Sequence, residues 1–133
     1  MSDVAVLFRV TLQVSDLEKG AAFYAKLLGQ EGRAIRGARH YFDCGGVILA
    51  LVDPTAGGQA ARSMPDDLYL SVARLATFHA RAKKLRCLAK GDVHGEPAGA
   101  MVVRPWGERS FYVTDPFGNE LCFVEKGSEY TGA

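Results

Sequence analysis

The sequence predicts a single α+β domain of two βαβββ modules, an internal repeat whose curved sheets of mixed strand direction enclose one cleft. Two observations carry this prediction. Apolar residues alternate in 9–17 and again in 67–75 at a constant spacing of 58 residues, as between Leu12 and Leu70. Each alternating stretch then changes to helical spacing, which indicates a strand followed by a helix. A supersecondary unit repeated at a fixed spacing indicates two copies of one module that share a core.

The first module is expected at about 6–52. Its first strand leads into a helix that begins with a capping box, Ser15 with Glu18 three residues later, and ends at Gly29. Short strands are expected near 32–35, 41–43 and 47–52. The segment 53–66 contains two prolines and two glycines, and we expect it to link the modules.

The second module, at about 67–126, repeats this plan. Its strand 67–73 precedes a helix with Leu75, Phe78, Ala82 and Leu85 on one face. A stretch rich in Gly and Pro covers 89–107. Strands 110–114 and 120–125 then form a hairpin around 115–119, where Pro followed by Gly-Asn suits a tight reversal.

Composition excludes several classes of function. The chain has 133 residues, enough for one domain without disulfides or a structural metal. Its net charge of +1 gives no basic field for nucleic acid. No apolar run approaches the roughly 18 residues of a membrane span, and no signal peptide is evident. Three cysteines without a CxxC pair favour reduced thiols, so we expect a cytoplasmic protein with neither nucleic-acid nor membrane partners.

Strand alternation assigns side chains to two faces. We expect Leu12 and Leu70 to pack on the helices, which leaves the polar residues of both strands on the opposite faces, lining one shared cavity. In strand 47–52 we expect Ile48 to pack on the helix and Leu49 and Leu51 to face the cavity. An ordinary solvent-facing sheet remains the alternative. The expected ligand-binding cleft comprises Arg9, Thr11, Gln13, Leu49, Asp67, Tyr69, Ser71, Trp106, Phe111 and Cys122.

Three stretches of the chain resemble the vicinal oxygen chelate superfamily, which includes glyoxalase, bleomycin-resistance proteins and extradiol dioxygenases. They are 14–24 (VSDLEKGAAFY), Leu28-Gly29 and above all 105–119 (PWGERSFYVTDPFGN). The resemblance covers nearly the whole chain. It implies two modules around a cleft for a small-molecule ligand, commonly within a homodimer.

The resemblance also implies where a metal would bind. It places the family's ligands at Arg9 and Asp67 in the first strands, and at Leu49 and Cys122 in the last strands. A guanidinium has no lone pair to donate and leucine is inert. The other two side chains fall short of the three protein ligands usual in a catalytic site. We therefore expect neither a metal nor a cofactor here.

No other motif indicates a catalytic site. His40, His79 and His94 show neither i, i+4 nor HxH spacing, and we expect surface histidines. The chain contains no nucleophile elbow, P-loop or dinucleotide fingerprint. We expect Cys122 to be a small apolar filler, because nothing in the sequence indicates a lowered thiol pKa.

The expected function is metal-independent binding of a small molecule, either sequestering an antibiotic or binding an anionic or aromatic metabolite. Arg9 in the cleft favours an anion over a cationic drug such as bleomycin. Trp106, the only tryptophan, either stacks on a planar ligand or packs under its own loop. The alternative is a lyase, isomerase or dioxygenase-type enzyme of the same superfamily, with other metal ligands or with Asp67 as a general base.

The sharpest expectation concerns Arg9 and Asp67, which hold equivalent positions in the two repeats. We expect the Arg9 guanidinium to occupy the place of the metal and to pair with Asp67, within one chain or across a dimer. Two opposite charges in a partly dry cleft are costly alone and tolerable together.

Overall fold

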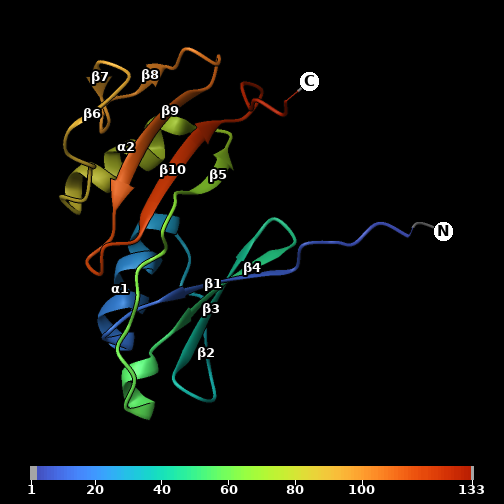
Figure 1. The fold of residues 1–133 in the computed structure, drawn as a ribbon, viewed down its shortest axis with the longest axis vertical. Helices are drawn as coiled ribbons and strands as arrows, with labels where there is room; N and C mark the ends of the chain where they lie inside the picture. Colours follow the sequence, from blue (N-terminus) through green and yellow to red (C-terminus); the bar gives the residue numbers. More distant parts are fainter. Residues whose placement is uncertain (1–2, 133) are drawn as a thin grey trace.

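Two βαβββ modules follow one another in the computed structural model, which describes residues 3–132 (Figure 1). The first contains β1 (Arg9–Gln13), α1 (Leu17–Leu28), β2 (Arg33–Ile35), β3 (Arg39–Cys44) and β4 (Val47–Val52). Its strands form one sheet in the order β1-β4-β3-β2, here called the N-terminal sheet. β1 runs parallel to β4, and the other neighbours are antiparallel.

The second module repeats this topology with β5 (Leu68–Val72), α2 (Leu75–Lys84), β8 (Val102–Val103), β9 (Arg109–Thr114) and β10 (Glu120–Glu125). Its strands form the C-terminal sheet in the order β5-β10-β9-β8, with β5 parallel to β10. The segment between the modules contains the short 3-10 helix η1 (Pro54–Gly57). The stretch after α2 contains a small hairpin, β6 (Asp92–Val93) and β7 (Glu96–Pro97).

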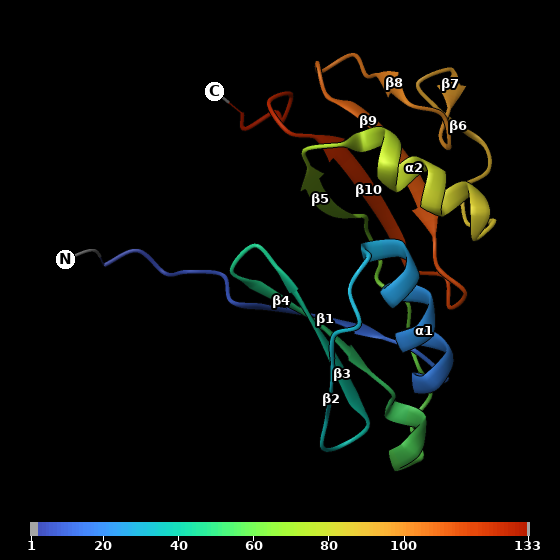
Figure 2. The same cartoon turned by 180° about the vertical axis from the view of Figure 1, so that it is seen from behind.

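One hydrophobic core spans both modules. α1 packs on β3 and β4, α2 packs on β9 and β10, and the two helices contact each other (Figure 2). Leu12, Leu27, Leu75 and Phe123 are all buried in this core. This shared core explains why the module is repeated, because each module buries its apolar face against the other module as well as against its own helix. The face of each sheet that points away from its helix is called its open face below.

A buried polar cluster joins the modules. The Tyr24 hydroxyl of α1 donates to Asp115 Oδ2 at 2.6 Å, and Asn119 Nδ2 donates to the Gln13 carbonyl at 3.0 Å. The Met64 amide donates to Asn119 Oδ1 at 2.8 Å. The turn 115–119 that closes the second module therefore also holds α1, the end of β1 and the linking segment.

The first helix begins differently from the prediction. Its N-cap is Asp16 rather than Ser15, because Asp16 has extended backbone angles and its side chain accepts the Lys19 amide at 3.0 Å. Both residue types cap helices well, and their adjacency made the sequence ambiguous. The C-cap Gly29 is as predicted, with φ +71°.

Strand pairing confirms the predicted faces of β1 and β5 and reverses that of β4. Leu49 lies opposite Val10 and Leu51 opposite Leu12, so both point toward α1, while Ile48 lies beside Arg9 on the open face. The expectation for β4 was wrong because Val47–Val52 is apolar throughout. A strand without polar residues carries no alternation from which its faces can be read.

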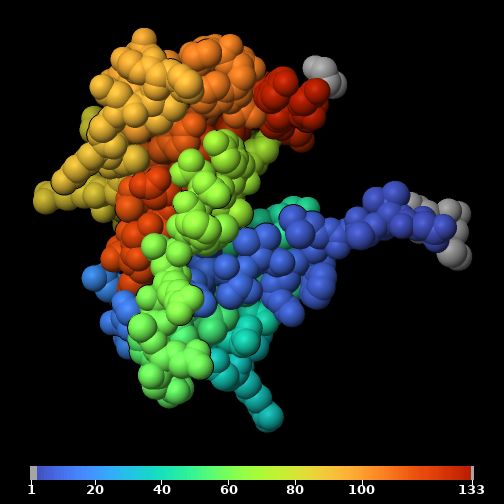
Figure 3. All heavy atoms as spheres, viewed as in Figure 1, coloured from blue at the N-terminus to red at the C-terminus, as the bar shows by residue number. Residues whose placement is uncertain are grey.

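The two sheets do not close around one cleft within the chain. β1 and β5 are edge strands of separate sheets and do not pair with each other. The N-terminal arm, residues 3–8, extends away from the body with Val6, Leu7 and Phe8 exposed (Figure 3). Within residues 3–132, no helix is long and apolar enough to cross a membrane.

Candidate functional site

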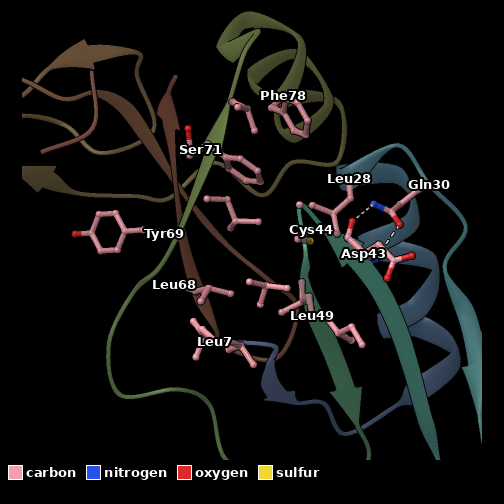
Figure 4. Close-up of a pocket in the computed structure, with 17 residues that line it drawn as sticks. Leu7, Leu28, Gln30, Asp43, Cys44, Leu49, Leu68, Tyr69, Ser71 and Phe78 are labelled. Atoms are coloured by element: carbon pink, nitrogen blue, oxygen red, sulfur yellow. Dashed lines mark hydrogen bonds between the residues drawn. The ribbon is translucent and has the colours of Figure 1, made fainter. Parts of the chain in front are cut away.

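Two hollows lie beside β5, one on each of its sides. The first, the apolar groove, has a volume of about 490 Å³ and opens between the modules. Leu28, Leu49, Leu68 and Phe78 contribute to its apolar wall (Figure 4). At its rim the Gln30 side-chain amide bonds the Asp43 backbone, with Nε2 donating to the carbonyl at 2.8 Å and Oε1 accepting the amide at 3.2 Å. This groove is a gap in the shared core and carries little polar chemistry.

The second hollow, the tail hollow, has a volume of about 560 Å³ and lies on the open face of the C-terminal sheet. The Tyr69 ring points to the side of β5 away from the apolar groove (Figure 4). The segment after β10, residues 126–132, is called the tail below and forms one wall of this hollow. The lining comprises Tyr69, Leu70, Ser71, Trp106, Glu108, Val124, Glu129 and Tyr130.

A buried carboxylate organises the tail hollow. Glu108 is 8% exposed, and its Oε1 accepts the Trp106 indole N–H at 2.8 Å. Its Oε2 accepts the Tyr130 amide at 2.9 Å, so one side chain fixes both an aromatic ring and the tail. The Ser71 hydroxyl donates to Glu129 Oε2 at 2.6 Å and holds the other side of the tail. Hydrogen bonding to Ser71 lowers the pKa of Glu129, which is therefore ionised at neutral pH.

Arg104 lies beneath this region, fully buried at 2% exposure. Its guanidinium donates to the Ser110 hydroxyl and carbonyl and to the carbonyls of Ala98 and Ala100, and it lies over the Tyr112 ring. Nη1 is the one buried side-chain polar atom of the described residues that lacks a hydrogen-bond partner. Arg104 thus fastens the 98–100 loop across the open face of the sheet.

The structure brings four of the predicted cleft residues to the two hollows. Leu49, Tyr69 and Ser71 line the apolar groove. Tyr69, Ser71 and Trp106 line the tail hollow. Arg9 and Thr11 lie on the open face of the N-terminal sheet and line neither hollow. Gln13 also lies there, but its side-chain oxygen accepts the Arg62 amide at 2.8 Å and so anchors the linking segment.

Within one chain the expected Arg9–Asp67 pair does not form. The Arg9 guanidinium lies over the rings of Phe8 and Tyr41, at 4.9 and 5.9 Å from their centroids. The ion pairs within residues 3–132 join Arg33 to Asp43 and Arg109 to Glu125. Asp67 instead lies near Glu120, whose pKa is raised first by partial burial and then by the Asp67 charge. The in-chain expectation fails because the two sheets do not face each other.

Leu49 and Phe111 do not lie on the open faces that the prediction assigned to them. Phe111 is fully buried in the main core, where its ring stacks on Phe123 with centroids 5.4 Å apart. β9 alternates, so Ser110 and Tyr112 are the open-face residues on either side of it. Leu49 packs in the same core, as its pairing with Val10 requires.

Cys122 lies on the open face as predicted, packed with Tyr112, Val124 and Ala98 in a second, smaller apolar cluster. Burial raises the pKa of its thiol to about 11, so the thiol is protonated at neutral pH. Its surroundings are those of a packing residue.

The three histidines occupy separate places. His40 Nε2 lies 2.8 Å from the Glu31 carbonyl, and His79 Nε2 lies 2.9 Å from the Gly99 carbonyl. His94 contacts the edge of the Trp106 ring, with centroids 5.3 Å apart. Among the described residues, no three His, Cys, Asp or Glu side chains are grouped as a metal site would require.

Comparison with known proteins identifies the family. The sequence model of the Glyoxalase/Bleomycin resistance protein/Dioxygenase superfamily matches residues 6–123, and the chain belongs to this superfamily. A glyoxalase/bleomycin resistance protein from Albidiferax ferrireducens T118 is 25% identical, with a TM-score of 0.70 over 90% of this chain and 98% of that chain. No curated protein sequence matches the chain.

Two further solved structures share the fold. A lactoylglutathione lyase from Agrobacterium tumefaciens is 22% identical, with a TM-score of 0.64 over 94% of this chain and 96% of that one. A glyoxalase-related enzyme from Fulvimarina pelagi is 21% identical, with a TM-score of 0.68 over 92% and 89% of the two chains.

Strand pairing also corrects one position in the metal-site alignment. Cys122 lies opposite Tyr69, and the repeat relates Tyr69 to Thr11, whose partner in β4 is Ala50. The β4 position equivalent to Cys122 is therefore Ala50 rather than Leu49. Alanine, like leucine, has no donor atom for a metal.

The sequence reasoning missed Arg104, Glu108, Glu129 and Tyr130. The alternation of polar and apolar residues in 109–114 predicts that Ser110 and Tyr112 share a face with their neighbours in β10. Nothing comparable marks the tail, because 126–132 has neither periodicity nor a motif. Only the folded chain brings it beside β5.

Proposed function

We propose that the protein binds a planar aromatic small molecule without a metal, and that the ligand lies in the tail hollow. One observation carries this proposal: a hollow of about 560 Å³ gathers Tyr69, Ser71 and Trp106 from distant parts of the chain. A concave site lined by aromatic rings and a few fixed polar groups is the usual form of a small-molecule site. Sequestering an antibiotic or an aromatic metabolite is the corresponding activity.

The donor chemistry at the family's metal positions supports metal independence. Arg9 and Ala50 supply no ligand atom. Cys122 is buried and packed with Tyr112, Val124 and Ala98 in an apolar cluster, which are the surroundings of a packing residue. Asp67 alone remains a good ligand, and one carboxylate does not meet the three protein ligands of a catalytic centre.

An NMR titration tests the proposal. EDTA-treated protein labelled with ¹⁵N is titrated with 2-naphthol, a neutral planar probe. We expect saturable shifts at the Tyr69 and Ser71 amides and at the Trp106 indole N–H, unchanged when zinc is added. Trp106→Leu should weaken binding, and Val103→Ala, at an exposed apolar residue outside the hollow, serves as the control. Shifts confined to other residues, or none at all, contradict the proposal.

We also propose a homodimer in which the open N-terminal sheet of one protomer faces the open C-terminal sheet of the other. Two features support it. β1 and β5 are unpaired edges within a chain, and the two open faces have opposite charge. The N-terminal sheet presents Arg9 and Arg39, and the other sheet presents Asp67 and Glu120. In this arrangement Arg9 pairs with the partner's Asp67.

Charge reversal tests the dimer. Sedimentation at micromolar concentration should give a dimer for the native chain and a larger monomer fraction for Arg9→Asp and for Asp67→Arg. The double variant should recover the dimer, because it restores opposite charges across the interface. A native monomer, or a double variant no better than the singles, rules out this pairing.

The Asp67–Glu120 contact favours a second candidate, an enzyme of the same superfamily that transfers protons. Glu120 has a raised pKa, which suits a general acid, and Asp67 is its neighbour. The assay follows exchange of carbon-bound hydrogen in dihydroxyacetone in D₂O by NMR. Exchange above the buffer rate that is lost in Asp67→Asn would support an enzyme, and its absence leaves binding as the function.

A further inference from the structure

We propose that the tail hollow takes an organic cation, with Tyr69, Trp106 and Tyr130 around the cationic group and Glu108 and Glu129 neutralising it. This inference rests on the proposed function, since it names the chemical class of ligand for the same hollow. It also departs from the expectation of an anionic ligand. That expectation depends on Arg9, which does not line this hollow within one chain and which is engaged with Asp67 across the interface in the dimer proposed above.

The charges of the lining carry the first part of the argument. The hollow contains two carboxylates, and none of its lining residues is Lys, Arg or His. Glu108 is only 8% exposed. The groups that donate hydrogen bonds to it, the Trp106 indole and the Tyr130 amide, are both neutral. Neither ion pair of the described residues involves it. A buried carboxylate without a counter-ion is costly, and a cation arriving from solvent relieves that cost.

Arg104 and Arg109 are the arginines nearest to Glu108 in sequence, and both are engaged elsewhere. Arg109 pairs with Glu125, and the guanidinium of Arg104 is directed at other groups. All four of its hydrogen bonds go to Ser110, Ala98 and Ala100. Among the described residues, Arg104 forms no ion pair with Glu108. Arg104 also does not line the hollow. Lys126 acts on Glu129 but does not line the hollow, so both carboxylates still face a ligand there.

The aromatic rings carry the second part. Tyr69 and Tyr130 are 53% and 59% exposed, unusually open for rings of their size. Trp106 is half-buried. Aromatic faces attract cations, most strongly tryptophan, and quaternary ammonium groups are held by cages of such rings. Here the cage is preorganised, because Glu108 holds the indole of Trp106 and the backbone of Tyr130.

Part of this hollow lies outside the segment that the superfamily model matches. The match to the superfamily covers residues 6–123, whereas Glu129 and Tyr130 lie beyond it. The Ser71 hydroxyl donates to Glu129 at 2.6 Å and so holds the tail against β5, and the Gly127 amide, within the tail, donates to the same carboxylate at 2.6 Å. The second carboxylate and the third ring thus come from a segment beyond the residues that the superfamily model matches.

Fluorescence of the full-length protein tests the inference, because Trp106 is the only tryptophan and belongs to the cage. Benzyltrimethylammonium is compared with phenylacetate, which reverses the charge, and choline with 3,3-dimethylbutan-1-ol, its neutral isostere. We expect saturable changes in emission with both cations, and dissociation constants at least about 10-fold weaker for phenylacetate and the neutral alcohol. Tyr130→Ala should weaken the binding of benzyltrimethylammonium about 3- to 10-fold, the range of one cation–π contact. Glu129→Gln should weaken its binding by a similar factor of about 3 to 10, because the substitution removes one of the two negative charges.

Controls separate this inference from the proposed function. Glu31→Gln removes an exposed carboxylate that does not line the hollow, and it should leave cation binding unchanged. Circular dichroism verifies that each variant is folded. If phenylacetate binds as tightly as benzyltrimethylammonium, the cation class is wrong while small-molecule binding stands. Cation binding that is indifferent to Glu129→Gln and Tyr130→Ala places the cation elsewhere and overturns the assignment. If 2-naphthol binds and neither cation does, the inference alone fails, and if none of these probes binds, both fail.

Discussion

Tyr24→Phe removes one hydroxyl from the polar cluster that joins the two modules. Tyr24 is fully buried, and its hydroxyl donates to Asp115 Oδ2 at 2.6 Å. After the change, Oδ2 keeps one donor, Asn119 Nδ2 at 2.8 Å, and Oδ1 keeps the amides of Phe117 and Asn119. A hydrogen bond to a charged group contributes about 1.5–3 kcal/mol, and the remaining donors favour the lower half, so we expect a loss of about 2 kcal/mol.

Urea unfolding followed by circular dichroism measures this loss as a change in the free energy of unfolding. Tyr130→Phe removes a hydroxyl from an exposed ring and should leave that free energy unchanged. A double-mutant cycle with Asp115→Asn isolates the pair, and we expect a coupling energy of about 1–2 kcal/mol. A loss below about 0.5 kcal/mol for Tyr24→Phe would refute the idea that this bond holds the modules together.

The same substitution has a pH signature. Burial, and then the Asp115 charge, raise the pKa of Tyr24 well above its ordinary value of 10.0. A group with a raised pKa in the folded state contributes stability that is complete below its unfolded pKa and is lost as the pH rises above it. The native chain should therefore lose stability above pH 10 more steeply than Tyr24→Phe. Parallel slopes between pH 10 and 11 would contradict this assignment.

Two further experiments test the packing of the C-terminal sheet and the end of α1. Iodoacetamide at pH 8 should modify the half-buried Cys44 long before Cys122, because the thiol of Cys122 is buried and has a pKa of about 11. Peptide mass spectrometry measures the order of modification. Equal rates would show that the open face of the C-terminal sheet is not packed as described. Gly29→Ala should lower the free energy of unfolding by about 1–2 kcal/mol, since φ is +71° and a Cβ would lie 2.7 Å from the Arg81 guanidinium. Gly57→Ala, with open space around it, is the matched control, and equal effects of the two would exclude a conformational cause.

The sequence was most informative where polar and apolar residues alternate. β1 and β5 alternate strictly, and their faces, the repeat and the helix that follows each strand are as predicted. β4 carries six apolar residues, so neither Leu49 nor Ile48 could be assigned by pattern. Phe111 was placed wrongly because it was assigned to the cleft through the family resemblance of 105–119, although the alternation of Ser110 and Tyr112 around it puts Phe111 in the core.

The tail hollow could not be predicted for a different reason. Its organising contacts join Glu108 to Tyr130 and Ser71 to Glu129, residues that are 22 and 58 positions apart. None of these residues lies in a periodic pattern that marks it as facing a ligand. A buried carboxylate and a tail held by single hydrogen bonds depend on tertiary geometry, which local propensity does not encode.

The repeat and its divergence together suggest how one chain makes a polar cleft. Equivalent positions in the two modules carry Arg9 and Asp67, Thr11 and Tyr69, and Gln13 and Ser71, so the modules keep one backbone plan but present different chemistry. A symmetric dimer places each residue opposite a partner residue twice, because its interface is self-complementary. In the dimer proposed above, each of two identical clefts would receive a basic face from one protomer and an acidic, aromatic face from the other. Two identical repeats would oppose like charges instead, and the divergence between the modules is therefore what makes such a pairing electrostatically favourable.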